Sequence, residues 1–128
     1  MDAPVVLDAS AVSALVKGED GGEIVSARCL GAVISAVNFS EVVEVLARIG
    51  LPIDVWEQRL ASIGIGIVAF SSEQATTTAA LRPPTRPAGL SLADRACLAL
   101  ALELDAPVLT ADRAWSKLDV GVEIELIR

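Results

Sequence analysis

The chain has 128 residues and a formal net charge of −7, from 17 acidic and 10 basic residues. This length predicts one domain spanning residues 1–128. A chain that holds nucleic acid by bulk attraction is basic and often offers stacking rings, whereas aromatic residues make up 3% of this one. It contains no histidine, which excludes histidine acid–base chemistry, Ser-His-Asp triads and histidine zinc sites.

Several features predict a cytoplasmic protein without a membrane segment. No apolar run approaches the ~18 residues of a spanning helix, and Asp2 and Asp8 interrupt the N-terminus where a signal peptide would be apolar. Cys29 and Cys97 lie far apart in apolar surroundings, so we expect two buried thiols. The hydrophobic content of 53% predicts an interface with a second copy or a partner.

The predicted elements alternate between strands and helices along the chain. We expect strands at 4–10, 32–37, 65–70, 106–111 and 123–128, and helices at 11–18, 22–31, 38–50, 53–64, 71–82, 91–105 and near Trp115. Residues 83–89 are expected to form a loop, because they contain three prolines. This order predicts an α/β fold in which a central, mostly parallel sheet of about five strands is covered on both faces.

Two of the helices are amphipathic. One carries Phe39, Val42, Val43, Leu46 and Ile49 at helical spacing, and the next carries Ile53, Trp56, Leu60 and Ile63. Both apolar faces are expected to belong mainly to the core, with a groove for a partner as the alternative.

Four acids fall where a parallel sheet brings strand ends together. Asp8 and Asp112 close the first and fourth strands, and Glu41 and Asp94 lie in the first turns of two helices. Four carboxylates at one edge would repel one another, and a divalent cation resolves that repulsion. Oxygen ligands without histidine or cysteine select Mg²⁺ or Mn²⁺.

Each acid also has a purely structural interpretation. Asp8 and Asp112 suit helix N-caps, and the sequences NFSE (38–41) and SLAD (91–94) both fit a capping box. The sequence SSEQ (71–74) has the same pattern without a strong acid at its end, so the pattern requires no function. The hydroxyls of Ser10 and Thr110 lie beside the acids and could orient a carboxylate, although ordinary turn and strand chemistry explains them equally well.

The chain resembles the PIN domain, and more specifically the VapC-like toxins of bacterial toxin–antitoxin pairs. The resemblance rests on VVLDASAVSALV (5–16), VISAVNFSEVVEVL (33–46), LSLADRACLALALELDAPVLTADRAW (90–115) and the closing strand. It implies a three-layer α/β/α PIN-like fold and makes Asp8, Glu41, Asp94 and Asp112 the metal ligands, with Ser10 and Thr110 at positions where the family often keeps hydroxyls. Glu44, one turn after Glu41, ranks below it.

The resemblance further implies a Mg²⁺- or Mn²⁺-dependent endoribonuclease that cleaves RNA, forms a homodimer and is inhibited by a VapB-like antitoxin. The antitoxin's C-terminal segment is expected to lie in a groove and approach the acids. Local contacts to phosphate or to antitoxin acids are expected from Arg82, Arg86, Arg95 and Arg113, with Lys117 close by; solvated surface charge is the alternative for each.

The implied mechanism is hydrolysis by metal-activated water. Asp8, Asp94 and Asp112 are assigned mainly to metal binding, and Glu41 to orienting or deprotonating the attacking water. A haloacid-dehalogenase-type phosphatase would need a second Asp where Ser10 stands, and a receiver domain would need a late Lys at a strand end, where Lys117 does not lie. A catalytically silent PIN-like module that acts only through protein binding remains the alternative.

Overall fold

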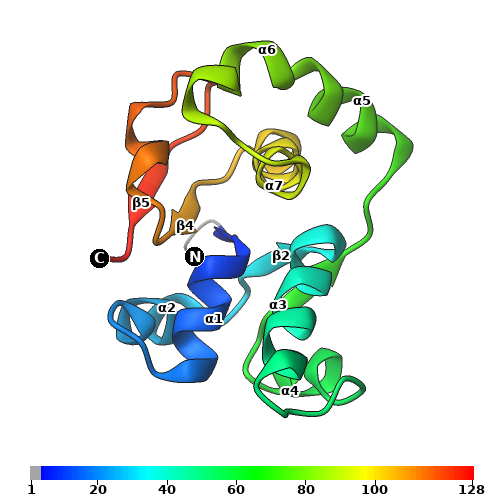
Figure 1. Cartoon of the computed structure of the whole chain (residues 1–128), viewed down its shortest axis with the longest axis vertical. Helices are drawn as coiled ribbons and strands as arrows, with labels where there is room; N and C mark the ends of the chain where they lie inside the picture. Colours follow the sequence, from blue (N-terminus) through cyan, green and yellow to red (C-terminus); the bar gives the residue numbers. More distant parts are fainter. Residues whose placement is uncertain (1–3) are drawn as a thin grey trace.

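The computed structural model describes residues 4–128. Its centre is one sheet of five parallel strands in the order β3-β2-β1-β4-β5 (Figure 1). The strands are β1 (Val6–Leu7), β2 (Val33–Ser35), β3 (Gly66–Val68), β4 (Val108–Thr110) and β5 (Ile124–Leu126). The α/β prediction with about five strands is therefore confirmed, and the sheet is parallel throughout rather than mostly parallel.

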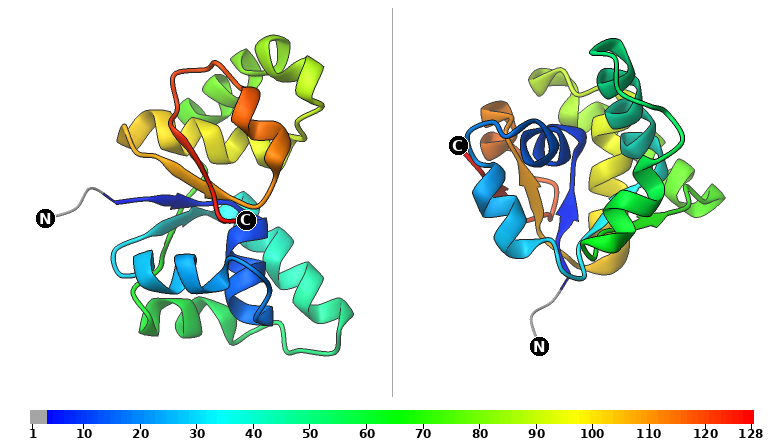
Figure 2. Two further views of the ribbon diagram at one scale, coloured as in Figure 1. Left: turned by 90° about the vertical axis from the view of Figure 1, so that its left-hand side faces the viewer. Right: turned by 90° about the horizontal axis from the view of Figure 1, so that it is seen from below.

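Helices cover both faces of this sheet, which gives the three layers seen edge-on in Figure 2. One face carries α1 (Ala9–Lys17), α2 (Gly22–Arg28), α3 (Ala36–Arg48) and α4 (Trp56–Ser62). The other carries α5 (Ser72–Ala80), α6 (Arg82–Thr85), the 3₁₀ turn η1 (Arg86–Ala88), α7 (Leu92–Leu104) and the 3₁₀ turn η2 (Arg113–Lys117).

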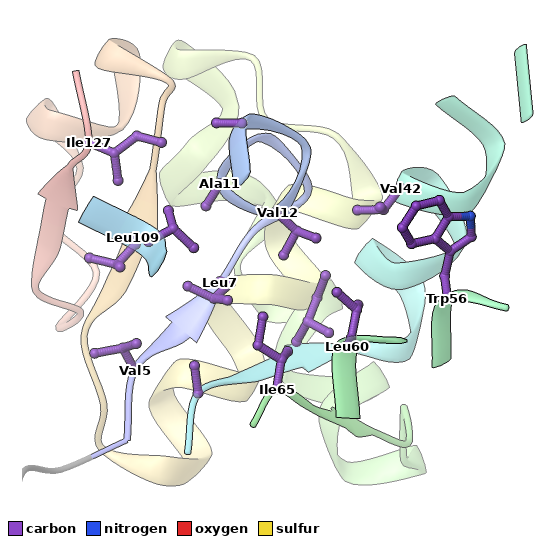
Figure 3. Packing of buried hydrophobic residues seen from close by; sticks show 14 of the residues in the cluster. Val5, Leu7, Ala11, Val12, Val42, Trp56, Leu60, Ile65, Leu109 and Ile127 are labelled. Carbon is purple, nitrogen blue, oxygen red and sulfur yellow. The ribbon is translucent and has the colours of Figure 1, made fainter. Parts of the chain in front are cut away.

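The apolar strands feed two cores, one on each face. Val5 and Leu7 pack into the core beneath α1, α3 and α4 (Figure 3), whereas Val6 between them packs against α7 and η2 on the other face. Successive strand residues point to opposite faces, so a strand buried on both faces has no polar position. This explains the nearly continuous apolar run of β1 and of β4.

Helix α3 begins earlier than the sequence predicts. Its N-cap is Ser35, the last residue of β2, whose hydroxyl accepts from the Val37 amide at 3.2 Å. Asn38 is thus a buried residue inside the helix, so the predicted NFSE capping box is wrong, and Glu41 lies in the second turn rather than in the predicted first turn. The strand passes into the helix without a linker because a serine that ends a strand can also cap the helix.

The neighbouring helix α4 is shorter than predicted. Ile53 lies before it and is 67% exposed, and Ile63 follows it and is also exposed. Trp56 and Leu60 do reach the core, as do Val42 and Leu46 of α3. The amphipathic faces therefore contribute mainly to the core, with exposed apolar residues left at their ends.

The proline-rich stretch is not the loop that we expect from its sequence. It forms α6 and η1, and each has proline at its first or second position. A proline there removes no helical hydrogen bond, because the first amides of a helix have no acceptor within it. The prolines therefore shape two short helical turns rather than prevent them.

Two further predictions concern cysteines and membranes. Cys97 is buried as expected, whereas Cys29 is only half-buried at the end of α2, where its thiol donates to the Ser26 and Ile63 carbonyls. Both thiols are free. Within residues 4–128, no helix has the length and apolar character needed to cross a bilayer.

Candidate metal centre and active site

The chain path brings the four predicted acids to one edge of the sheet. Helices α1 and α3 start where β1 and β2 end, and Asp112 follows the end of β4. Helix α7 leads into the start of β4, so its own first turn, with Asp94, lies at the opposite, carboxyl edge. In parallel α/β sheets this edge is where ligands bind.

Asp8 is the most enclosed of the four, with 4% of its surface exposed. One carboxylate oxygen, Oδ1, accepts from the Ala11 amide at 2.9 Å and from the Ser10 hydroxyl at 2.7 Å. The other, Oδ2, accepts from the Thr110 hydroxyl at 2.5 Å. Asp8 is therefore the N-cap of α1, as its structural interpretation predicts, and also the centre of a polar network.

Two hydroxyls extend that network from β1 to the end of β4. The Ala111 amide donates to the Ser10 hydroxyl at 2.9 Å, and the Asp112 amide donates to the Thr110 hydroxyl at 3.0 Å. Each hydroxyl thus accepts from the β4 side and donates to Asp8. The structure gives both serine and threonine the orienting contact that was one of their two sequence interpretations.

Asp94 lies in the capping box predicted from SLAD. Its amide donates to the Ser91 hydroxyl at 3.1 Å, and its Oδ2 accepts from the Ser91 amide at 3.0 Å. The similar SSEQ pattern forms only one of the two bonds of a capping box. The Ser71 hydroxyl accepts from the Gln74 amide, but the Gln74 side chain donates to Glu103 and does not contact the Ser71 backbone. The box fixes the direction of Asp94 at the start of α7.

The charge of Asp94 acts on two of the other acids. Burial raises the pKa of Asp8, against the opposing hydrogen bonds from Thr110, Ser10 and Ala11, and the charge of Asp94 raises it further. Burial also raises the pKa of Glu41, followed by the charge of Asp94, while Asn38 opposes the rise. Asp8, Glu41 and Asp94 come from three different elements, so the effect of Asp94 on the other two marks a shared site.

The buried thiol of Cys97 lies beneath the same site. Burial raises its pKa well above the usual range, and the charges of Asp8, Asp94 and Glu41 raise it further, in that order. A neutral thiol in this position adds no charge beneath the carboxylates.

Asp112 joins the other acids in a different way. Its side chain is exposed and caps η2, where Oδ1 accepts from the Ala114 amide at 3.0 Å. Its backbone amide is tied to Asp8 through Thr110. The structure therefore places Asp112 at the rim of the site through its backbone.

Asn38 is the residue of this site that the sequence interpretation missed. It is 1% exposed, and its Nδ2 donates to the Ala93 carbonyl of α7 at 3.0 Å. This bond ties α3, which carries Glu41, to α7 one residue before Asp94. The spacing of three residues between Asn38 and Glu41 puts both on one helix face and would have revealed it, had Asn38 been placed inside the helix.

The donor set fits a hard divalent cation in its chemistry. Carboxylate and hydroxyl oxygens are what Mg²⁺ and Mn²⁺ prefer, and a cation would relieve both the burial of charge and the repulsion by Asp94 that raise the pKa values of Asp8 and Glu41. Within residues 4–128, no three acidic or cysteine side chains stand at the spacing of a formed metal centre. The repelling carboxylates are thus gathered at one edge without being closed around one point.

Arg95 lies outside the site, and Glu44 is the smallest of the influences that raise the pKa of Glu41, after burial and the charges of Asp94 and Asp8. Glu44 is exposed and pairs with Arg48 at 3.5 Å, in keeping with its rank below Glu41. The prediction that Arg95 contacts phosphate or antitoxin is wrong, because this side chain is 7% exposed and its guanidinium donates to the Thr78 carbonyl at 2.8 Å. It joins α7 to α5 instead. Arg82, Arg86 and Arg113 are exposed as that prediction requires.

A sequence model of the PIN domain family matches residues 5–121. The chain belongs to the PIN domain family. PIN domains are generally nucleases and typically use divalent metals. No curated protein sequence matches the chain significantly.

Solved structures show the same PIN fold. A toxin–antitoxin complex from Klebsiella pneumoniae has a chain with 19% identity and a TM-score of 0.70, covering 94% of this chain and 99% of that one. DNA-bound VapBC from Salmonella typhimurium gives 16% identity, a TM-score of 0.71 and coverage of 99% and 100%. VapBC-5 from Mycobacterium tuberculosis gives 23% identity, a TM-score of 0.58 and coverage of 99% for both chains. At these identities the likeness concerns the fold.

Proposed function

We propose that this PIN domain is a metal-dependent endoribonuclease and the toxin of a VapBC-like toxin–antitoxin pair. One observation carries the proposal: at the carboxyl edge of a parallel sheet, burial and the charge of Asp94 raise the pKa of both Asp8 and Glu41, and the three acids come from separate elements. Unpaired carboxylates that repel one another destabilise a fold, so their gathering at a ligand-binding edge supports a functional site.

In this proposal Asp8, Glu41, Asp94 and Asp112 hold Mg²⁺ or Mn²⁺. A bound ion of this kind lowers the pKa of a water ligand and stabilises negative charge on a phosphate. Neighbouring side chains and amides orient these carboxylates. Ser10 and Thr110 hold both oxygens of Asp8 in fixed directions, and the Ser91 amide holds one oxygen of Asp94, Oδ2.

Glu41 is assigned the role of orienting and deprotonating the attacking water. Its pKa is raised by burial and by Asp94, which makes it a better proton acceptor than a solvated carboxylate. Asn38 locks the helix that carries it against α7. Asp8 and Asp94 are more strongly committed to hydrogen bonds with their own backbone surroundings, which suits ligands rather than bases.

The proposed partners are an RNA substrate, a VapB-like antitoxin and a second copy of this chain, in the cytoplasm. Relatives of the same fold are described as toxin–antitoxin complexes, which supports the antitoxin. Large apolar side chains on the surface support a partner or dimer interface, among them Leu30, which is 89% exposed, and the connection between α3 and α4 with Ile49 and Ile53. The catalytically silent module remains the second candidate only if the acids bind no metal.

Cleavage of a structured RNA by the purified protein tests the proposal. With Mg²⁺ we expect cleavage that stops in EDTA, and Asp94→Asn should lower the rate by more than about 100-fold, since residues that merely orient a metal ligand already account for about 10–100-fold. Asp54→Asn, an exposed acid between α3 and α4, is the matched control and should cleave like the wild type. Wild-type cleavage by Asp94→Asn would overturn the assignment, and metal-insensitive cleavage would overturn the mechanism.

A further inference from the structure

The basic residues of this acidic chain are unevenly partnered. Four of the ten pair with carboxylates: Lys17 with Glu19, Arg28 with Glu125, Arg48 with Glu44, and Arg128 with Glu19. Arg59 lies over the Trp56 ring at 4.9 Å, and Arg95 is buried against Thr78. Among residues 4–128 the remaining four have no acidic partner within 4.0 Å, and they are Arg82, Arg86, Arg113 and Lys117.

These four bases come from two short segments that lie side by side. Arg82 and Arg86 belong to α6 and η1, and Arg113 and Lys117 to η2, and both views in Figure 2 place these segments next to each other. Between them runs a cavity of about 840 Å³. We call it the proline groove: its α6–η1 wall includes Pro84, Pro87 and Ala88, and its η2 wall includes Arg113 and Lys117.

The walls of the proline groove lie close along the chain to two of the site acids. Arg113 directly follows Asp112, and η1 ends three residues before Ser91, which caps the helix that carries Asp94. Asp119 is the acid that lines the groove, against the two bases of the η2 wall. The groove is therefore locally positive in a chain whose net charge is −7.

We propose that the proline groove binds the sugar–phosphate backbone of the RNA strand beside the bond to be cleaved. The inference rests on the proposed nuclease function. It supplies local contacts to phosphate in a chain whose net charge of −7 opposes the binding of RNA. A groove of this size lies within the ~300–1,000 Å³ of typical ligand pockets, so it can take a nucleotide unit. Arg113 and Lys117 offer donors to phosphate oxygens, and the proline and alanine wall offers apolar surface to a ribose.

Position favours RNA over an acidic protein segment as the occupant. A strand whose phosphate reaches Asp94 and Asp112 must continue along the surface next to them, and the proline groove is that surface. Four bases left without an acid keep their charge available for a polyanion, whereas the paired bases elsewhere are already compensated.

Binding of a fluorescently labelled single-stranded RNA, followed by anisotropy in EDTA over a range of salt concentrations, tests the inference. The double variant Arg113→Ala/Lys117→Ala should bind more weakly, with a salt slope smaller by about 1.4, because each phosphate contact on a single strand contributes about 0.7. Lys17→Ala/Arg48→Ala removes the same two charges at paired, exposed positions and should keep the wild-type slope.

The outcomes separate this inference from the proposed function. Equal slopes for the two double variants would overturn the groove as the RNA site, and so would a groove variant that loses affinity for a poly-glutamate peptide but not for RNA. If the groove variant has the reduced slope but the wild type never cleaves RNA, the groove remains the RNA-binding site and the proposed nuclease activity is refuted. Where cleavage is present, the groove variant should raise KM for RNA more than it lowers kcat, in contrast to Asp94→Asn.

Discussion

The acidic site and the proline groove are neighbours of opposite charge that do not neutralise each other. Among residues 4–128 no ion pair joins Asp8, Glu41, Asp94 or Asp112 to a base of the groove. The acids are held by strand ends, helix caps and hydroxyls, whereas the bases extend from short turns into solvent. Because the acids and the bases do not pair with each other, the acids remain available to bind a cation and the bases remain available to bind a phosphate.

Three kinds of residue in this region should control different properties of the protein. Carboxylates should control the chemistry, groove bases should control affinity for RNA, and the residues that hold the carboxylates should control both stability and chemistry. The first two substitutions below test the last group, which the structure describes in most detail, and the third tests one of the carboxylates.

Thr110 should give the largest change in stability. Its hydroxyl is buried, accepts from the Asp112 amide and donates to Asp8. Thr110→Val keeps the shape but leaves both partners unpaired, so we expect the free energy of unfolding to fall by about 1–3 kcal/mol. Thr110→Ser keeps the hydroxyl and is the control. Urea denaturation measures both, and a valine variant as stable as the serine variant would contradict the network.

Asn38 should show a smaller loss of stability with a clear effect on the site. Asn38→Ala removes the bond to the Ala93 carbonyl, which is worth about 0.5–1.5 kcal/mol net, and frees α3 from α7. Because Glu41 and Asp94 then shift relative to each other, the Mn²⁺ concentration for half-maximal cleavage should rise. Ser40→Ala, on the exposed side of the same helix, should leave that concentration unchanged. An unchanged midpoint in Asn38→Ala would make the residue purely structural.

Glu41 should show the smallest and most pH-dependent change. Burial and the charge of Asp94 raise its pKa in the fold above the ordinary value of 4.5, so the folded state binds its proton more tightly than the unfolded state does. Wild-type stability therefore falls as pH rises from below 4.5 through the raised pKa, and remains lowered at neutral pH. Glu41→Gln removes this charge, so in EDTA it should be more stable than the wild type at pH 7 and lose that advantage below 4.5.

Thermal unfolding at several pH values measures the Glu41 effect. Glu57→Gln, on the exposed face of α4, is the control for the loss of one acidic side chain. A stability difference between Glu41→Gln and the wild type that grows toward low pH would contradict the raised pKa of Glu41.

The sequence predicts the edge of the sheet at which the acids lie, because their positions follow from topology. Asp8 and Asp112 end apolar strands, and Asp94 follows a capping serine, so a parallel sheet brings them to one edge whatever the details of packing. Asn38 and the groove escape such reasoning. The sequence misses Asn38 because it places the helix start two residues too late, at Asn38 rather than at Ala36.

Tertiary packing decides the remaining differences. Arg95 follows a site residue in sequence, yet the packing of α5 on α7 turns it inward to the Thr78 carbonyl. The prolines of residues 83–89 predict a loop by their count, but their positions at the first turns of α6 and η1 permit helix, and only the fold shows that these turns face η2. Local residue patterns predict neither outcome.

The central claim is that the gathered carboxylates form a cation site, and binding of Mn²⁺ to the purified protein tests it most directly. Titration at neutral pH, with free Mn²⁺ followed by electron paramagnetic resonance, should show saturable binding to the wild type. Asp8→Asn and Asp94→Asn should each weaken it by at least about tenfold, the lower limit for residues that orient a metal ligand, while Asp54→Asn should bind like the wild type. Equal binding by all four proteins, or none by the wild type, would contradict the claim.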